Sequence, residues 1–109
     1  MSLPDVIDVK HGVIDAATSG DNTLKAAVSG KRILITSLVL VSAGTVNVRF
    51  ESGASGTALT GQMNLIANTG FSLNYNQYGW FVTAKNELFN LELSAAISVD
   101  GCFSFREID

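Results

Sequence analysis

A glycine-rich stretch, "ESGASGTALTG" at residues 51 to 61, has a composition that could form a phosphate-binding loop. Such loops place a lysine and then a Ser or Thr after their last glycine, at the N-terminus of a helix. Here Gly56 precedes a threonine, Gly61 precedes a glutamine, and the stretch contains no lysine. The residues that follow alternate as in a strand. We therefore interpret the stretch as a surface connection between strands.

The side chains that most often act as a base or nucleophile are scarce. His11 is the single histidine and Cys102 the single cysteine, and no G-x-S-x-G motif supplies a serine nucleophile. Cys102 has no basic neighbour in the sequence that would activate its thiol, so it is interpreted as a packed or half-buried structural residue. One cysteine also excludes an intrachain disulfide and fits folding in a reducing cytoplasm.

Carboxylates could supply a catalytic pair for glycoside hydrolysis or ligands for a metal ion. The candidates are Glu51, Glu87, Glu92 and Asp100. All four fall in predicted turns or on the outward phase of predicted strands, where no cleft is implied. The acidic residues near the N-terminus lack the spacing of a calcium-binding loop. The sequence therefore predicts no catalytic residue, no metal site and no cofactor, and we expect a protein that is not an enzyme.

The segment "NYNQYGWF" at residues 74 to 81 combines aromatic rings with amide side chains. Ring faces stack on sugar C–H groups while amides bond to hydroxyls, so Tyr75, Tyr78 and Trp80 are candidates for a glycan-binding surface. The alternative, which we favour at this stage, is packing in the core or at a subunit contact. One of Trp80 and Phe81 must face inward, because they are neighbours at the start of a predicted strand.

The elements that would position these residues are all strands, because apolar residues alternate with period two from end to end. The predicted strands are 13–17, 23–28, 32–43, 46–51, 62–66, 71–75, 80–83, 88–94 and 97–108. Eight to nine strands without a crossover helix predict an all-β fold, an antiparallel β-sandwich that is jelly-roll-like. We expect one domain over residues 11–109, preceded by an N-terminal arm, residues 1–10, that could dock on a partner.

The predicted strand at 32–43, "RILITSLVLVSA", is apolar on both faces. Strict alternation places its odd positions from Ile33 to Val41 on one face and Leu34, Leu38 and Leu40 on the other. In an antiparallel protein of this size, such a strand is either central in a two-layer core or covered by another subunit. Leu34, Leu38 and Leu40 are therefore our candidates for an oligomer interface.

Charge and hydropathy exclude two classes of partner. The net charge is -3 and the basic residues are scattered, which is unlike the basic patch of a nucleic-acid-binding protein. The longest apolar run, 33–41, is about half as long as a membrane span and contains two hydroxyl residues. We expect no nucleic-acid partner and no membrane insertion.

Three segments together resemble small β-sandwich proteins encoded among the structural genes of tailed bacteriophages. They are "SGKRILITSLVLVSAGTVNVRFESGASGTALTG", "LIANTGFSLNYNQYGWFVT" and "LFNLELSAAISVDG". The similarity is a pattern of a Gly-Lys-Arg strand entry, an F-x-S-G loop and a G-W-F strand, and it extends from about His11 onward.

This resemblance implies a virion structural protein of the capsid decoration or fibre-head kind. Such proteins are commonly trimeric jelly rolls that assemble in the host cytoplasm. The implied partners are other copies of the chain and capsid or tail proteins. A fibre-head domain could also bind a surface glycan, which keeps Tyr75, Tyr78 and Trp80 as the alternative site. No single residue is carried over from the family as a known contact.

Overall fold

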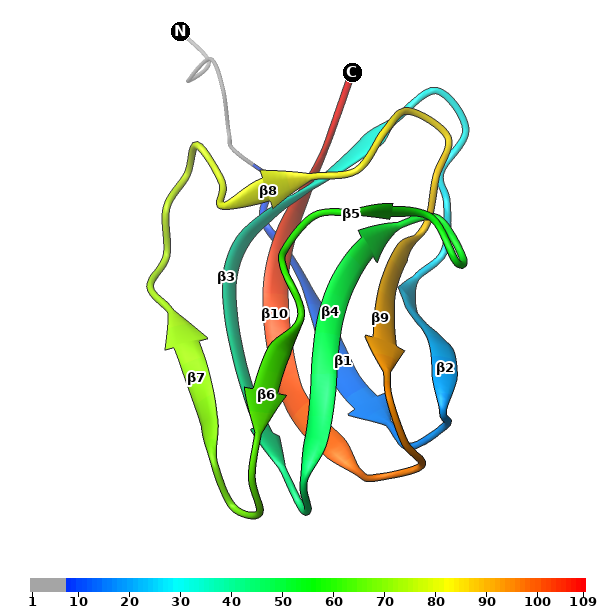
Figure 1. Cartoon of the computed structure of the whole chain (residues 1–109). Coiled ribbons are helices and arrows are strands. Elements are labelled where there is room, and N and C mark those ends of the chain that lie inside the picture. Colours follow the sequence, from blue (N-terminus) through cyan, green and yellow to red (C-terminus); the bar gives the residue numbers. More distant parts are fainter. Residues whose placement is uncertain (1–7) are drawn as a thin grey trace, which may run out of the picture.

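The computed structural model describes residues 8–109, which form ten β-strands (Figure 1). The strands are β1 (Lys10–Ala16), β2 (Gly20–Lys25), β3 (Arg32–Ser42), β4 (Val46–Ser52), β5 (Thr57–Ala58), β6 (Met63–Leu65), β7 (Gly70–Leu73), β8 (Phe81–Val82), β9 (Phe89–Leu93) and β10 (Val99–Ile108). The pattern predicts eight to nine strands, and the additional one is β5, inside the glycine-rich stretch. Within residues 8–109 there is no helix long and apolar enough to span a membrane.

The strands form two antiparallel sheets that pack face to face, so the predicted β-sandwich is confirmed (Figure 1). Sheet A has the order β1-β10-β3-β7, with β8 also paired to β3. Sheet B has the order β2-β9-β4-β5, with β6 also paired to β4. The pairing is nested along the chain, β1 with β10, β2 with β9, β3 with β7 and β8, and β4 with β5 and β6. This is the strand order of a jelly roll.

Residues 1–7 of the predicted N-terminal arm lie outside the described residues. Lys10, the last residue of that arm, already belongs to β1, where it pairs with Phe105 of β10. The sandwich therefore begins within the segment that the sequence assigns to the arm.

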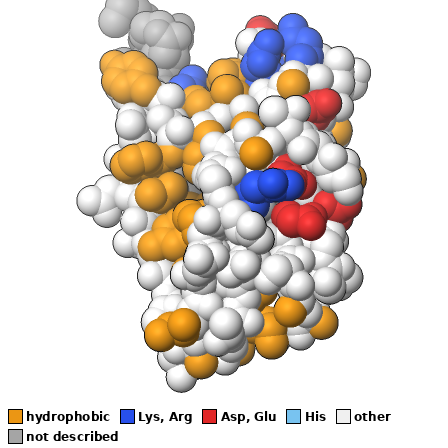
Figure 2. Space-filling model, in the orientation of Figure 1, with side chains coloured by type: hydrophobic (Ala, Val, Ile, Leu, Met, Phe, Trp, Pro, Cys, Tyr) orange, Lys and Arg blue, Asp and Glu red, His pale blue; other side chains and the backbone are white. Residues whose placement is uncertain are grey.

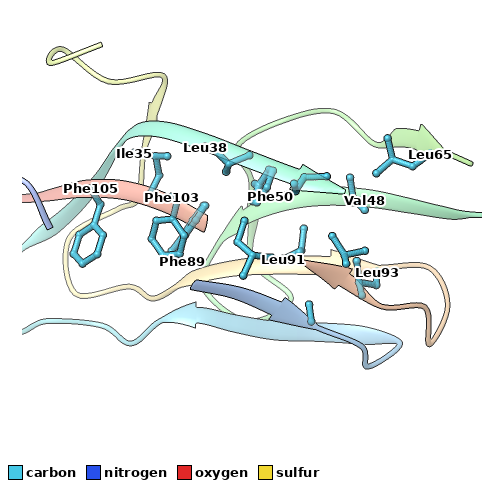
Figure 3. Packing of buried hydrophobic residues seen from close by; sticks show 14 of the residues in the cluster. Ile35, Leu38, Val48, Phe50, Leu65, Phe89, Leu91, Leu93, Phe103 and Phe105 are labelled. Carbon is cyan, nitrogen blue, oxygen red and sulfur yellow. The ribbon is translucent and has the colours of Figure 1, made fainter. Parts of the chain in front are cut away.

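The core lies between the two sheets and is built from their inward-facing side chains. Three aromatic rings occupy its centre: Phe50 stacks on Phe89 with ring centroids 5.3 Å apart, and Phe103 meets Phe89 edge-on at 5.3 Å (Figure 3). All three are essentially inaccessible to solvent. Burying an aromatic ring of this size removes a large apolar area from water, so these rings contribute strongly to the stability of the sandwich.

A bulge in β3 changes which of its residues face the core. β10 pairs Ser104 with Ser37 but Phe105 with Ile35, so Thr36 is an extra residue on β3. Ile35 before the bulge and Leu38 after it are therefore both core residues (Figure 3). The strict alternation that the sequence predicts for this strand is wrong, because the phase shifts by one residue at Thr36.

Candidate functional site

The glycine-rich stretch is a surface connection, as the sequence predicts. It continues from the end of β4 and is held against β2, because the backbone N–H and the hydroxyl of Ser55 both donate to the Asp21 carboxylate, at 3.0 and 2.8 Å. Ser55 has φ 50 and Gly53 φ 85, the left-handed conformation that lets the chain turn back over sheet B. The glycines therefore allow the chain to turn, and the hydrogen bonds of Ser55 attach this turn to β2.

Three carboxylates meet on the outer side of sheet B, at the edge of this connection. The nearest oxygens of Asp21, Glu51 and Glu92 all lie within 4.8 Å of one another. They come from β2, β4 and β9, which are adjacent in the sheet. Figure 2 shows acidic side chains gathered around a basic one on this face. We call these three residues the acidic cluster.

The buried member of the acidic cluster is fully compensated by neighbouring donors. Glu51 is inaccessible to solvent, and its Oε2 accepts a hydrogen bond from Arg49 Nε at 2.9 Å, with a second contact from the same guanidinium. Its Oε1 accepts a bond from Asn90 Nδ2 at 2.9 Å, and Asn90 also donates to Asp21. The three carboxylates are close enough to hold a cation, while Arg49 already balances the charge of Glu51.

The pKa values of the two other carboxylates move in opposite directions. Burial, a hydrogen bond shared with Asp21 and the nearby charge of Glu51 raise the pKa of Glu92. The hydrogen bonds that Ser55 and Asn90 donate lower the pKa of Asp21. Asp21 therefore ionises first as pH rises, and Glu92 keeps its proton to higher pH than an ordinary glutamate.

The sequence alone did not reveal the acidic cluster. Glu51 and Glu92 are on the outward strand phases that the alternation predicts, but their proximity depends on the pairing of β4 with β9 and of β9 with β2. That nested pairing joins residues far apart in the chain. The other carboxylates considered, Glu87 and Asp100, lie elsewhere: Glu87 Oε1 accepts a hydrogen bond from Ser52, and Asp100 pairs with Asp15 on sheet A.

The aromatic segment lies mostly at the surface. Tyr75, Tyr78 and Trp80 expose between 48% and 81% of their area. Trp80 Nε1 donates to the carbonyl of Asn74 at 2.8 Å, so the indole is anchored within its own segment, and the backbone N–H of Trp80 donates to the carbonyl of Ile35 in β3. Phe81 is the ring that turns inward, where it stacks on Phe50 at 5.6 Å.

An apolar cavity of about 280 Å³ lies beside this segment, where side chains of the two sheets leave a gap. Its lining consists of Phe50, Thr60, Met63, Phe71, Leu73, Trp80 and Phe81. The hydroxyl of Thr60 accepts a bond from the Phe50 N–H and donates to the Gly61 carbonyl, so it has no free donor. Figure 2 shows hydrophobic side chains clustered along this side of the molecule.

The leucines predicted as an oligomer interface are buried within the single chain. Leu38 and Leu40 belong to the core cluster between the sheets. Leu34 lies beneath Gly79, where a Cβ atom on the glycine would come within 2.2 Å of Leu34 Cδ1. The structure thus leaves none of the three available to a partner.

The surface-exposed apolar residues of β3 are instead Val39 and Val41. They lie on the outer side of sheet A together with Val13 of β1, and the three expose between 40% and 64% of their area. Strand pairing places Val13, Cys102 and Val39 side by side across three strands. We call the surface formed by Val13, Val39, Val41 and Cys102 the valine face.

The two residues considered for nucleophilic chemistry are also on this side of sheet A. Cys102 is half-buried between Val13 and Val39, as expected for a packed thiol. His11 is exposed and pairs with Ser104. The hydroxyl of Ser104 contacts those of Thr36 and Ser37 at 2.7 and 2.5 Å, so its hydrogen-bonding partners are side chains of β3.

Comparison of the chain with protein-family models, with curated proteins and with solved structures returned no match. Function is therefore inferred from the surfaces described above.

Proposed function

We propose that this chain is a non-enzymatic structural protein of a virion that assembles as a homo-oligomer, in the role of a capsid decoration protein. The observation that carries the proposal is the valine face, a group of exposed aliphatic side chains on the outer side of sheet A. Exposed apolar patches on soluble proteins are typical of interaction surfaces. Covering the valine face with another subunit would remove it from water.

The fold and the resemblance support this proposal without deciding it. Jelly rolls recur in viral capsid proteins and also in lectins, so the architecture is compatible with an assembly role and with glycan binding. The resemblance to phage structural proteins favours assembly in the host cytoplasm, incorporation into the virion and contacts with capsid or tail proteins. It also implies a trimer.

The test is whether the chain is part of purified particles. Virus particles from the source of this gene would be banded by density and their proteins identified by mass spectrometry. We expect this chain at a fixed ratio to the major shell protein. Detection only in the fraction without particles would contradict the proposal.

The second candidate function is carbohydrate binding by Tyr75, Tyr78 and Trp80. The specific observation in its favour is that all three rings are exposed on one short segment, with Trp80 anchored to Asn74. Stacked sugars would change the emission of Trp80, the single tryptophan. A shift on titration with a glycan that Tyr78→Ala abolishes, with stability unchanged, would support this function, whereas a flat response across a broad panel would reject it.

A further inference from the structure

We propose that the valine face binds the same face of a second copy of this chain, around a two-fold axis that lies in the interface and runs across the strands. The inference rests on the proposed homo-oligomer, since it names the surface through which that oligomer forms. It assigns a dimer in place of the trimer that the resemblance implies, because a face that contacts its own copy is isologous.

The side chains of the valine face are short enough for a second sheet to pack against it. Pairing places Val13, Cys102, Val39 and Ser72 in one row across four strands. The neighbouring row, at one end of the face, consists of Asp15, Asp100, Val41 and Gly70, which has no side chain. Most of these side chains are short, so a second sheet can approach the valine face to about 10 Å.

The area of the face is comparable with that of a small specific contact. Sheet A presents a face four strands wide, and β10 is 10 residues long. Such a face buries at most on the order of 500 Å² per copy, or about 1,000 Å² in total, because some strands are short and the segment at 74–80 covers Leu34 and bonds to Arg106 at one end. That total reaches the lower end of specific protein interfaces.

Charges at the two ends of the face fix the relative orientation. Asp15 and Asp100 are directly opposite each other on β1 and β10, and both are exposed. Like charges in this position repel, so an approaching cation would be favourable. Farther along the same strands lie His11 and Arg106, whose Nη1 donates to the Gln77 carbonyl.

Only one two-fold arrangement brings the aspartates of one copy close to the basic residues of the other. An axis that runs across the strands makes the paired sheets antiparallel, so the Asp15 and Asp100 end of one copy meets the His11 and Arg106 end of the other. An axis parallel to the strands would instead place aspartates against aspartates. As in any two-fold dimer, each contact then occurs twice, once from each copy.

The outer side of sheet B is a weaker candidate for this contact. It carries the acidic cluster and Arg49, and the glycine-rich connection lies against its edge. Glu51 and its donors are already paired within the chain, so covering them would desolvate charge without a new partner.

Cys102 reports directly on the proposed interface, because it is the single cysteine and lies in the central row. The experiment measures the reaction rate of Cys102 with a thiol reagent as a function of protein concentration, alongside the mass by light scattering. We expect the rate to fall by about tenfold or more as the dimer forms, because a covered thiol must wait for dissociation. The mass should approach twice the 11.5 kDa of one chain.

Substitutions test whether the copies associate through the valine face or through another surface. Val13→Asp and Val39→Asp should remain folded by circular dichroism, stay monomeric and react rapidly at Cys102 at every concentration. Ile66→Asp is the matched control: Ile66 is about as exposed as Val13 but lies in a turn outside sheet A, so this variant should behave like the unmodified chain.

A charge exchange tests the orientation. Asp100→Arg alone and Arg106→Asp alone should each weaken association, and the double variant should restore it. An oligomer that persists in Val39→Asp, or single charge variants that associate unchanged, would overturn the proposed interface and leave the homo-oligomer standing. A chain that stays monomeric at all concentrations would overturn both.

Discussion

Arg49 and Glu51 lie two residues apart on β4 and form an ion pair in which the carboxylate is inaccessible to solvent while the arginine side chain remains 40% exposed. The pair joins the outer side of sheet B to the glycine-rich connection, because Asn90 links Glu51 to Asp21 and Asp21 holds Ser55. Glu51 faces outward by its strand phase and is nevertheless buried. The network therefore stabilises the end of the sandwich at which β4 leaves the sheet.

Arg49→Met should destabilise the fold, because it leaves the buried Glu51 carboxylate without its cation. Removing one partner of a fully buried pair costs about 3–5 kcal/mol, and the exposure of Arg49 reduces this to about 1–3 kcal/mol. Urea unfolding measures the change. The control is the double variant Arg49→Met with Glu51→Gln, which should lose less than the sum of the single variants. Simple additivity would show that the two residues do not act as a pair.

Glu92→Gln should stabilise the protein at neutral pH. The folded-state pKa of Glu92 is raised, so its protonated form adds stability that is fully present below the ordinary glutamate pKa and is lost as pH rises through the folded pKa. A glutamine keeps the neutral form at every pH. Thermal unfolding from pH 3 to 8 should show the variant above the unmodified chain at neutral pH and the two curves converging in acid. A gain of equal size at all pH values would contradict this explanation.

Gly12→Ala should destabilise the sandwich by about 1–3 kcal/mol, the usual cost of overpacking a core. A Cβ atom at this position would come within 2.3 Å of the Phe103 ring, which is itself held in the core. Gly61→Ala is the matched control, since nothing lies within 4 Å of its added methyl group. Chemical denaturation should show a loss for Gly12→Ala and little change for Gly61→Ala.

Leu40→Ala and Val41→Ala distinguish the two faces of β3 although the residues are neighbours. Leu40 is fully buried, so its truncation should cost about 2–5 kcal/mol of unfolding free energy. Val41 is exposed in the single chain, so Val41→Ala should change the stability of the monomer little and weaken association instead. A large loss for Val41→Ala in monomeric protein would place this residue in the core and contradict the described register.

The fold was predictable because its strands carry clear local signals. Val46, Val48 and Phe50 alternate with polar residues, and all three are buried between the sheets. The bulge at Thr36 was not predictable, because it arises from how β3 pairs with a strand more than sixty residues away. That single shift exchanges the expected faces, so Leu38 lies inside and Val39 outside.

The surfaces were predictable only in part. The aromatic segment is identifiable from composition, and its exposure follows from the asparagines and glycine that interrupt the strand pattern. The acidic cluster and the valine face each combine three strands, and neither can be derived from sequence spacing without the order of the strands in the sheets.

The central claim is that this chain is an assembly unit, and the most direct test is its absolute mass in solution, measured by light scattering after size exclusion over a range of concentrations. We predict a species of at least twice the 11.5 kDa chain mass that dissociates in Val39→Asp. A mass of 11.5 kDa at every concentration would contradict the claim and direct attention to glycan binding by Tyr75, Tyr78 and Trp80.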